Sequence, residues 1–388
     1  MKDYSLLFAD SVRNLKPSGI RRFFSIAEEM EDVISLGVGE PDYMTPLPAR
    51  QAGIASLEAG QTKYTANAGI AELRAEVCNY LDRRFGMRYT ADQCVITVGG
   101  SEAIDLCIRT FVNPGDEVLI PEPSFVAYDA ITRLVGGVPV SLVTKEEDEF
   151  RLSPQALKAA ITPKTKLLVF PYPSNPTGGV MRKEHLEEIA DVLRGTDIMV
   201  LSDEIYAELT YGDTHHVSFS TIEGMYDRTV VVNGFSKAYA MTGWRLGYAV
   251  GPEEVIALMN RIHQYVLMCA STTAQRAALV ALQECDEDIE IMRADYDSRR
   301  RMVVDRLNAM GLHCFDPQGA FYVFPSIQST GMNSQEFCER LVQEKRVAVV
   351  PGDAFGDCGD GFVRICYCYS VEHLTEALNR MEEFLKSL

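Results

Sequence analysis

The sequence lacks an apolar run long enough to cross a lipid bilayer, and its N-terminal residues lack the apolar core of a signal peptide. It is also short of positive charge. Thirty-seven lysines and arginines stand against 55 aspartates and glutamates, which gives a formal net charge of −18. An acidic surface disfavours nucleic acid and anionic membranes as partners. These absences predict a soluble, cytoplasmic protein that acts on small molecules.

Paired metal-ligand motifs are missing as well. The ten cysteines include no C-x-x-C pair, and the six histidines show no ligand spacing. We therefore expect no metal site, and we expect reduced thiols as in other cytosolic proteins. The chain does have 388 residues, 47% of them hydrophobic, which is enough for a large core and favours two domains.

Apolar runs alternate with helical patterns between residues 94 and 250. Runs of Val, Ile and Leu separated by helices are typical of a mostly parallel sheet that is covered on both faces. Strands are predicted at residues 95–98, 117–120, 139–143, 166–170, 198–202, 229–232 and 246–250. Helices are predicted at residues 19–30, 47–59, 70–85, 103–112 and 183–194.

The pattern becomes helical after residue 252 and then mixed. A long polar helix at residues 286–310 is predicted to connect the main body to a smaller α+β unit. In that unit we expect strands at residues 320–324, 347–349 and 362–366, and helices at residues 334–344 and 371–386. The predicted fold class is therefore α/β with a second α+β domain.

One stretch, residues 230–247, combines a buried strand with an unusual lysine. Three valines precede a turn at Gly234, Lys237 follows where the chain leaves the strand, and Arg245 lies beside the only tryptophan. An ammonium group at the end of a buried strand loses hydration, which lowers its pKa. A lysine of lowered pKa can form an imine with a carbonyl compound, as in pyridoxal phosphate enzymes. A surface lysine on a loop is an equally good interpretation of this stretch taken by itself.

Other polar residues follow neighbouring strands. Because ligands of open α/β sheets bind at the carboxyl ends of the strands, we expect these segments to share one edge of the sheet. They are Gly99–Glu102, Pro123–Phe125, Asn175–Gly179, Asp203–Tyr206 and Ser236–Lys237. Their convergence is hard to explain by packing alone.

With these motifs in order, the chain resembles the class I and II aminotransferases, pyridoxal-phosphate-dependent enzymes of fold type I typified by aspartate aminotransferase. The resemblance covers nearly the whole chain, from Pro17 to the C-terminal helix. It implies a large domain with a mostly parallel seven-stranded sheet between helices, and a smaller domain built from the two chain ends. The implied divisions are residues 1–46 (arm and part of the small domain), 47–285 (large, cofactor-binding domain) and 286–388 (small domain).

The resemblance assigns roles around the cofactor ring. Lys237 is implied to be the Schiff-base lysine that also moves the proton during catalysis. Asp203 is implied to bind the pyridinium nitrogen, and Tyr206 and Asn175 the phenolic oxygen of the cofactor. Phe125 is implied to stack on the ring.

The phosphate and the substrate have implied partners too. A helix begins at residues 100–102, and the N–H groups at a helix N-terminus suit an anion. Gly100, Ser101 and the backbone N–H of Glu102 are implied to bind the phosphate there. The other implied phosphate ligands are Ser236, Arg245 and, from the partner subunit of a homodimer, Tyr64. Arg364 is implied to hold the substrate α-carboxylate, with Asn175 and Gly39 on the same side. Gly234 departs from the family pattern, which usually has serine there, so another group is needed for the phosphate.

Each residue taken singly has a plainer interpretation. Asp203 suits a helix cap or an ion pair, Asn175 an ordinary turn, and Phe125 and Tyr206 a hydrophobic core. Arg364 suits an edge strand and Tyr64 an exposed loop. Only their joint order along the chain favours the active-site interpretation.

The sequence therefore predicts a homodimeric aminotransferase that interconverts α-amino acids and 2-oxo acids by a ping-pong mechanism, with aromatic or broad, aspartate-like specificity. Arg21 and Arg22 are candidates for a second carboxylate, whereas Phe23, Phe24 and Tyr322 suit an aromatic side chain. A C–S β-lyase on the same fold is the alternative. An effector-binding regulatory domain of this fold is a third interpretation, but it needs a fused DNA-binding segment, for which the acidic chain leaves no room.

Overall fold

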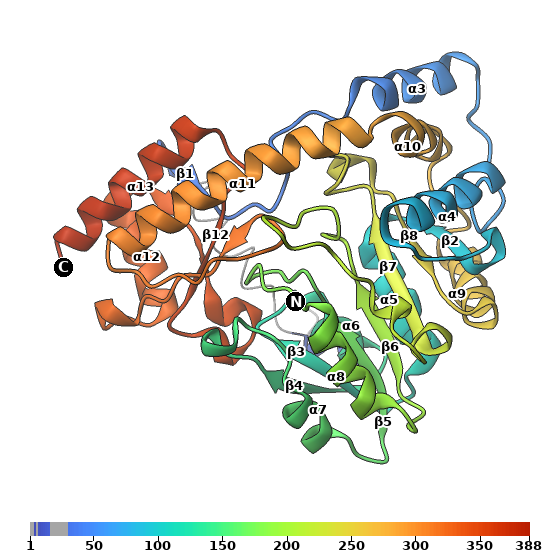
Figure 1. The fold of residues 1–388 in the computed structure, drawn as a ribbon, viewed down its shortest axis with the longest axis horizontal. Coiled ribbons are helices and arrows are strands. Elements are labelled where there is room, and N and C mark those ends of the chain that lie inside the picture. Colours follow the sequence, from blue (N-terminus) through green and yellow to red (C-terminus); the bar gives the residue numbers. More distant parts are fainter. Residues whose placement is uncertain (1–3, 5–6, 16–29) are drawn as a thin grey trace.

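The apolar runs predicted as strands form one seven-stranded sheet in the computed structural model, which describes residues 4, 7–15 and 30–388 (Figure 1). All neighbouring strands are parallel except β8, which is antiparallel to both β2 and β7. The order across the sheet is β2 (Cys94–Thr97), β8 (Gly247–Val250), β7 (Thr229–Gly234), β6 (Met199–Asp203), β5 (Thr165–Phe170), β3 (Glu117–Glu122) and β4 (Val138–Val143).

Helices cover both faces of this sheet, which explains the uninterrupted apolar runs. In β7, Val230 and Val232 pack in the cluster of α5 and α9, whereas Val231 packs in the cluster of α4 and α10. The helices of this part are α3 (Leu47–Glu58), α4 (Ala71–Phe85), α5 (Gly99–Phe111), α6 (Ala127–Leu134), α7 (Pro154–Ala160), α8 (Lys183–Leu193), α9 (Glu253–Val266) and α10 (Thr272–Glu284).

A second unit lies beyond the long helix α11 (Asp286–Ala309), which runs from α10 toward the C-terminal part (Figure 1). Strand β1 (Ile34–Ser35) pairs in parallel with β10 (Val347–Ala348), so the two ends of the chain meet in one sheet. The remaining elements are β9 (Tyr322–Val323), β11 (Val350–Pro351), β12 (Val363–Cys366), α12 (Ser334–Lys345) and α13 (Val371–Lys386), with α1 (Asp10–Arg13) near the N-terminus.

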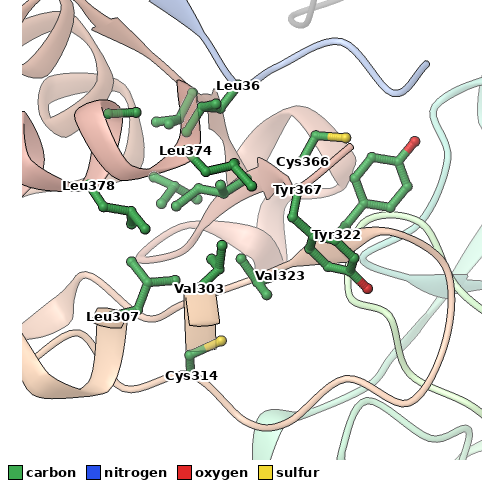
Figure 2. Close-up of a cluster of buried hydrophobic side chains, with 14 of the residues drawn as sticks. Leu36, Val303, Leu307, Cys314, Tyr322, Val323, Cys366, Tyr367, Leu374 and Leu378 are labelled. Atoms are coloured by element: carbon green, nitrogen blue, oxygen red, sulfur yellow. The ribbon is translucent and has the colours of Figure 1, made fainter. Parts of the chain in front are cut away.

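The core of this second unit draws on distant parts of the sequence. Figure 2 shows Leu36 from the N-terminal segment, Val303 from α11, Val323 from β9 and Leu374 from α13 in one buried cluster. Burial of such side chains is worth roughly 1.5–3 kcal/mol each. The domain divisions at residues 46 and 285 stay a prediction. The shared core supports one part of it, namely that both ends of the chain contribute to the smaller domain.

Some expectations differ in detail from the structure. The strand predicted at residues 320–324 is shorter, because only Tyr322 and Val323 pair with β12. Residues 19–29 of the first predicted helix lie outside the described residues. All ten cysteines are free in the structure, eight of them buried. Their reduced state in a cytosolic protein stays a prediction. In the described part of the chain, no helix combines the length and the apolar character that a membrane span requires.

Candidate active site

A cavity of about 470 Å³ lies where the carboxyl ends of the strands face the second unit. Lys237, Asp203 and Arg245 line this cavity together, although they come from different segments. Eleven of the predicted site residues line it: Gly39, Gly100, Ser101, Phe125, Asn175, Asp203, Tyr206, Ser236, Lys237, Arg245 and Arg364. Glu102 and Tyr64 do not. The convergence predicted from the strand ends is therefore present in the fold.

Lys237 follows β7 and extends its amine into this cavity. Its Nζ donates a hydrogen bond to the carbonyl oxygen of Gly39 at 2.6 Å. The ring centroids of Phe321 and Tyr206 lie 5.4 and 5.8 Å from the same atom. Burial lowers the pKa of Lys237, and the nearby Arg364 charge acts in the same direction. Such an amine is more readily neutral, and hence nucleophilic, than a surface lysine.

Asp203 ends β6 with its carboxylate fully inside the protein. The Tyr128 hydroxyl donates to Asp203 Oδ2 at 2.7 Å, and the Ile205 N–H donates to Oδ1 at 3.2 Å. Burial raises the pKa of Asp203 to about 6, although these hydrogen bonds and Lys237 oppose the shift. A buried carboxylate that is this costly to ionise suits a cationic partner within the cavity.

Tyr128→Phe tests how much its hydroxyl contributes to Asp203. A hydrogen bond to a charged group is worth about 1.5–3 kcal/mol, so we expect the affinity for pyridoxal phosphate to fall about tenfold or more. The pKa of Asp203 should rise further. Calorimetric titration of the cofactor-free protein with pyridoxal phosphate measures the first effect. An affinity equal to that of the wild type would show that the Tyr128 hydroxyl does not support the charged carboxylate.

Arg364, on β12, has its guanidinium held by two hydrogen bonds and by two aromatic rings. Nη1 donates to Asn175 Oδ1 at 2.8 Å and Nη2 to the Gly37 carbonyl oxygen at 2.6 Å. The rings of Tyr322 and Phe355 have centroids 4.5 and 4.8 Å from Cζ. Its Nε is buried and has no hydrogen-bond partner among the described residues. A buried guanidinium with unused donors suits a carboxylate ligand.

The N-terminus of α5 and Arg245 form the opposite end of the cavity. Val98 provides no side-chain cap for α5, so its first N–H groups remain available to an anion. Arg245 adopts a left-handed backbone conformation (φ 53°), and a Cβ atom added at Gly99 would lie 2.8 Å from its Nη2. Glycine at position 99 therefore allows the guanidinium to lie against the helix terminus.

The side chain of Glu102 is already engaged by other residues and does not line the cavity. Its carboxylate accepts hydrogen bonds from the Val98 N–H at 2.5 Å and is 2.5 Å from His263 Nδ1. Only the backbone of Glu102 is thus left for an anion, as the sequence suggested. Its part in cofactor binding stays a prediction.

Gly234 has a structural reason for departing from the family pattern. It pairs with Gly247 across β7 and β8, and a Cβ atom added there would lie 2.9 Å from Gly247 Cα and 3.1 Å from the Leu246 carbonyl oxygen. A serine does not fit without moving the backbone. Ser236, which lines the cavity, is the available hydroxyl near this point.

Gly234→Ser is therefore expected to destabilise the protein and not to increase its affinity for the cofactor. Overpacking of this kind costs about 1–3 kcal/mol. Urea denaturation of the cofactor-free variant measures the loss. A variant as stable as the wild type, with tighter cofactor binding, would contradict this account of the glycine.

Tyr64 lies in the loop between α3 and α4, and 81% of its surface is exposed. The loop is tied to a second one, because Asn67 Nδ2 donates to the Met268 carbonyl oxygen at 2.7 Å. Tyr265, beside Met268, is 83% exposed. This exposed aromatic surface is consistent with a tyrosine that acts outside its own subunit.

The cavity fits pyridoxal phosphate in each part. An amine of lowered pKa, a buried carboxylate, apolar walls that include Phe125 and Ile205, and an anion-binding helix terminus all face one space. The charges also suit the cofactor and a substrate. Asp203 offers a carboxylate to the ring nitrogen, and Arg245 and Arg364 offer two separate guanidinium groups to anions. No part of the observed donor set conflicts with the cofactor.

Sequence reasoning missed some residues of the cavity. Tyr128 lies one turn beyond Phe125, but its contact with Asp203 depends on the packing of α6 against β3, β4 and α5. Glu40 and Thr242 also line the cavity and are hydrogen-bonded to each other. Glu40 directly follows Gly39, which the sequence did single out, whereas nothing local marked Tyr128.

Comparisons with known proteins agree with this site. The family model "Aminotransferase class I and II" matches residues 31–381. The putative aminotransferase YugH of Bacillus subtilis is 52% identical over 97% of this chain and 98% of its own length. The aromatic-amino-acid aminotransferase 2 of Thermococcus litoralis is 44% identical over 98% of this chain and 99% of its own length.

Solved structures give the same result. The aspartate aminotransferase of Thermus thermophilus with maleate superposes with a TM-score of 0.93 at 38% identity, covering 99% of this chain and 100% of the other. The aromatic aminotransferase of Pyrococcus horikoshii superposes with a TM-score of 0.90 at 44% identity, over 94% of this chain and 99% of the other. The chain therefore belongs to the class I and II aminotransferases and is a pyridoxal-phosphate-dependent transaminase.

Proposed function

We propose that the protein is a homodimeric, cytoplasmic enzyme that transfers amino groups between α-amino acids and 2-oxo acids by a ping-pong mechanism, with aromatic or aspartate-like amino acids as substrates. The observation that carries this proposal is the shared cavity, in which Lys237, Asp203 and Arg364 face one another. The names of the relatives support the substrate class, since they include aromatic-amino-acid and aspartate aminotransferases.

Bound pyridoxal phosphate supplies an aldehyde and an electron-withdrawing ring. Lys237 would hold the cofactor covalently and, once released, would move the proton between the substrate Cα and the C4′ carbon of the cofactor. Asp203, through its buried carboxylate, would keep a positive charge on the ring nitrogen. Tyr206 and Asn175 would donate hydrogen bonds to the phenolic oxygen, and Phe125 would stack on the ring.

The remaining residues orient the two charged ends. Gly100, Ser101 and the backbone of Glu102 bind the phosphate with Ser236 and Arg245. Arg364 holds the substrate α-carboxylate in a fixed plane, because Asn175 and the Gly37 carbonyl already engage its edge. The Gly39 backbone lies on the same side. Holding both ends places the substrate Cα near the lysine amine.

A panel of amino acids and 2-oxo acids with the purified, cofactor-loaded enzyme tests the reaction and its specificity. An amino acid alone should yield about one equivalent of its 2-oxo acid per active site, without ammonia, because the second substrate is needed for turnover. Continuous release of pyruvate and ammonia from cysteine conjugates would instead identify a C–S β-lyase. Comparing the transamination rates at equal concentrations of aspartate, phenylalanine and tyrosine distinguishes aspartate-like from aromatic specificity.

The dimer is supported by exposed apolar side chains around Tyr64. Ile54 and Leu57, on the helix α3 that precedes the loop, are 57% and 56% exposed. Tyr265, three residues before the Met268 that contacts the loop, is 83% exposed. Large apolar patches on a protein surface mark interfaces. We propose that two copies pair through this surface, so that Tyr64 reaches the phosphate in the other subunit.

A mixture of two inactive variants tests this shared site. In a heterodimer of Lys237→Ala and Tyr64→Ala, one site combines an intact lysine with an intact tyrosine from the other subunit. Random pairing should therefore restore about a quarter of the wild-type activity after the variants are unfolded and refolded together. If Tyr64 acted within its own subunit, the mixture would stay as inactive as its components. Each variant refolded by itself is the control.

A further inference from the structure

Tyr322, on β9, contacts two residues of the proposed active site, Tyr206 and Arg364. Its hydroxyl is 2.9 Å from the hydroxyl of Tyr206, and the two rings meet edge to face at 5.9 Å. Both tyrosines are buried, and burial raises the pKa of each phenol above its ordinary value. Both groups therefore remain neutral donors near neutral pH.

The ring of Tyr322 also covers one face of Arg364. Its centroid is 4.5 Å from the guanidinium carbon, and the Phe355 ring lies 4.8 Å from the same atom. A guanidinium that contacts two aromatic rings has less freedom to move than one with a single ring beside it. One side chain therefore contacts the group proposed to bind the substrate carboxylate and the group proposed to bind the phenolic oxygen.

The backbone fixes Tyr322 in this position. Tyr322 pairs with Cys366 across β9 and β12, two residues beyond Arg364 on the same strand. Gly39 provides the space for its hydroxyl, because a Cβ atom at position 39 would lie 1.9 Å from the Tyr322 oxygen. Figure 2 shows the ring at the border of the buried cluster of the second unit.

We propose that Tyr322 is a positioning residue that couples the orientation of Arg364 to the donor strength of Tyr206. Its hydroxyl donates to the Tyr206 oxygen, which leaves the proton of Tyr206 for the phenolic oxygen of the cofactor and polarises that bond. Its ring keeps the Arg364 guanidinium in the plane that a carboxylate requires. The inference rests on the proposed function of these two residues. The charged or titratable groups that face the pair are Lys237, Asp203 and Cys366, besides Arg364.

Two substitutions separate the hydroxyl from the ring. Tyr322→Phe removes only the hydroxyl, so Tyr206 becomes a weaker donor and the phenolic oxygen keeps more negative charge. The pKa read from the pH-dependent absorbance of the bound cofactor should then rise by about half a unit or more. The dissociation constants of 3-phenylpropionate and succinate should stay within about twofold, because the ring still covers Arg364.

Tyr322→Leu removes the ring as well. Both dissociation constants, measured by calorimetry on the cofactor-loaded protein, should rise about tenfold. The matched control is Tyr367→Phe, which removes a buried hydroxyl that donates to the Ala320 carbonyl oxygen at 3.1 Å and does not line the cavity. That control should change neither the absorbance pKa nor the dissociation constants, even if it lowers the melting temperature.

The outcomes also separate this inference from the function beneath it. A wild-type protein without a pH-dependent cofactor band or carboxylate binding would overturn both. If the wild type shows both properties and Tyr322→Phe has the same absorbance pKa, the coupling to Tyr206 is wrong. If Tyr322→Leu binds both carboxylates as tightly as the wild type, the support of Arg364 is wrong. A shift in the Tyr367→Phe control equal to that of Tyr322→Phe would also overturn the proposal, because it would mark a general packing effect.

Discussion

Lys237→Ala is expected to lower the rate of transamination by about 10⁴-fold or more, because the side chain is both the covalent anchor and the proton carrier. Among the described residues that line the cavity, Lys237 has the only amine. Its neighbours are the Gly39 carbonyl and two aromatic rings, and none of these can act as a base in place of the lysine amine. Steady-state kinetics and the visible absorbance of the cofactor-loaded protein measure the two losses.

Loss of folding does not explain this expected result. Since burial lowers the pKa of Lys237 in the folded protein, its protonated form costs stability at neutral pH. That cost is present in full below the lowered pKa and fades as the pH rises toward the ordinary value of 10.5. The cofactor-free variant should therefore be at least as stable as the wild type near neutrality. Lys183→Ala, which alters a lysine whose side chain is 69% exposed, is the matched control and should retain full activity.

The strands of the large sheet could be predicted from the sequence because both of their faces are buried. Each predicted run between residues 94 and 250 overlaps an observed strand, and the C-terminal helix has the predicted bounds, Val371–Lys386. Continuous apolar runs and helical periodicity are local signals, so they need no knowledge of the fold. The prediction that polar strand ends share one edge then followed from the parallel arrangement.

The contacts that tune the site could not be predicted in this way. Tyr128 reaches Asp203 across 75 positions of the chain, and Tyr322 reaches Tyr206 across 116. Such contacts depend on how α6 packs against β3, β4 and α5, and on where β9 lies relative to Tyr206. A tyrosine in an apolar segment looks like any core residue until that packing is known. Gly234 shows the same limit, because its pairing with Gly247 explains the absent serine only in three dimensions.

Asp203→Asn is expected to reduce activity on the order of 10²–10³-fold while leaving the fold intact. Asparagine keeps the shape. Its Oδ1 can accept from the Ile205 N–H and its Nδ2 can donate to the Tyr128 hydroxyl, but it carries no charge to hold a proton on the ring nitrogen. Loss should therefore appear in kcat for every amino acid tested. Full activity in this variant would mean that the ring nitrogen has a different partner.

The same variant should be more stable than the wild type when no cofactor is bound. Burial raises the pKa of Asp203 from 3.8 to about 6, so a folded protein at neutral pH holds an unfavourable charge. Below about pH 4 the group is protonated in both the folded and the unfolded chain and the cost is absent, and above about pH 6 it is present in full. The difference in unfolding free energy, variant minus wild type, should thus rise by about 2–3 kcal/mol from pH 4 to pH 7. Urea denaturation across this range measures it, and because other titrating groups cancel in the difference, a value that falls with pH would contradict the buried charge. Saturating pyridoxal phosphate should reverse the order of stability at pH 7, because only the wild-type carboxylate then gains a cationic partner.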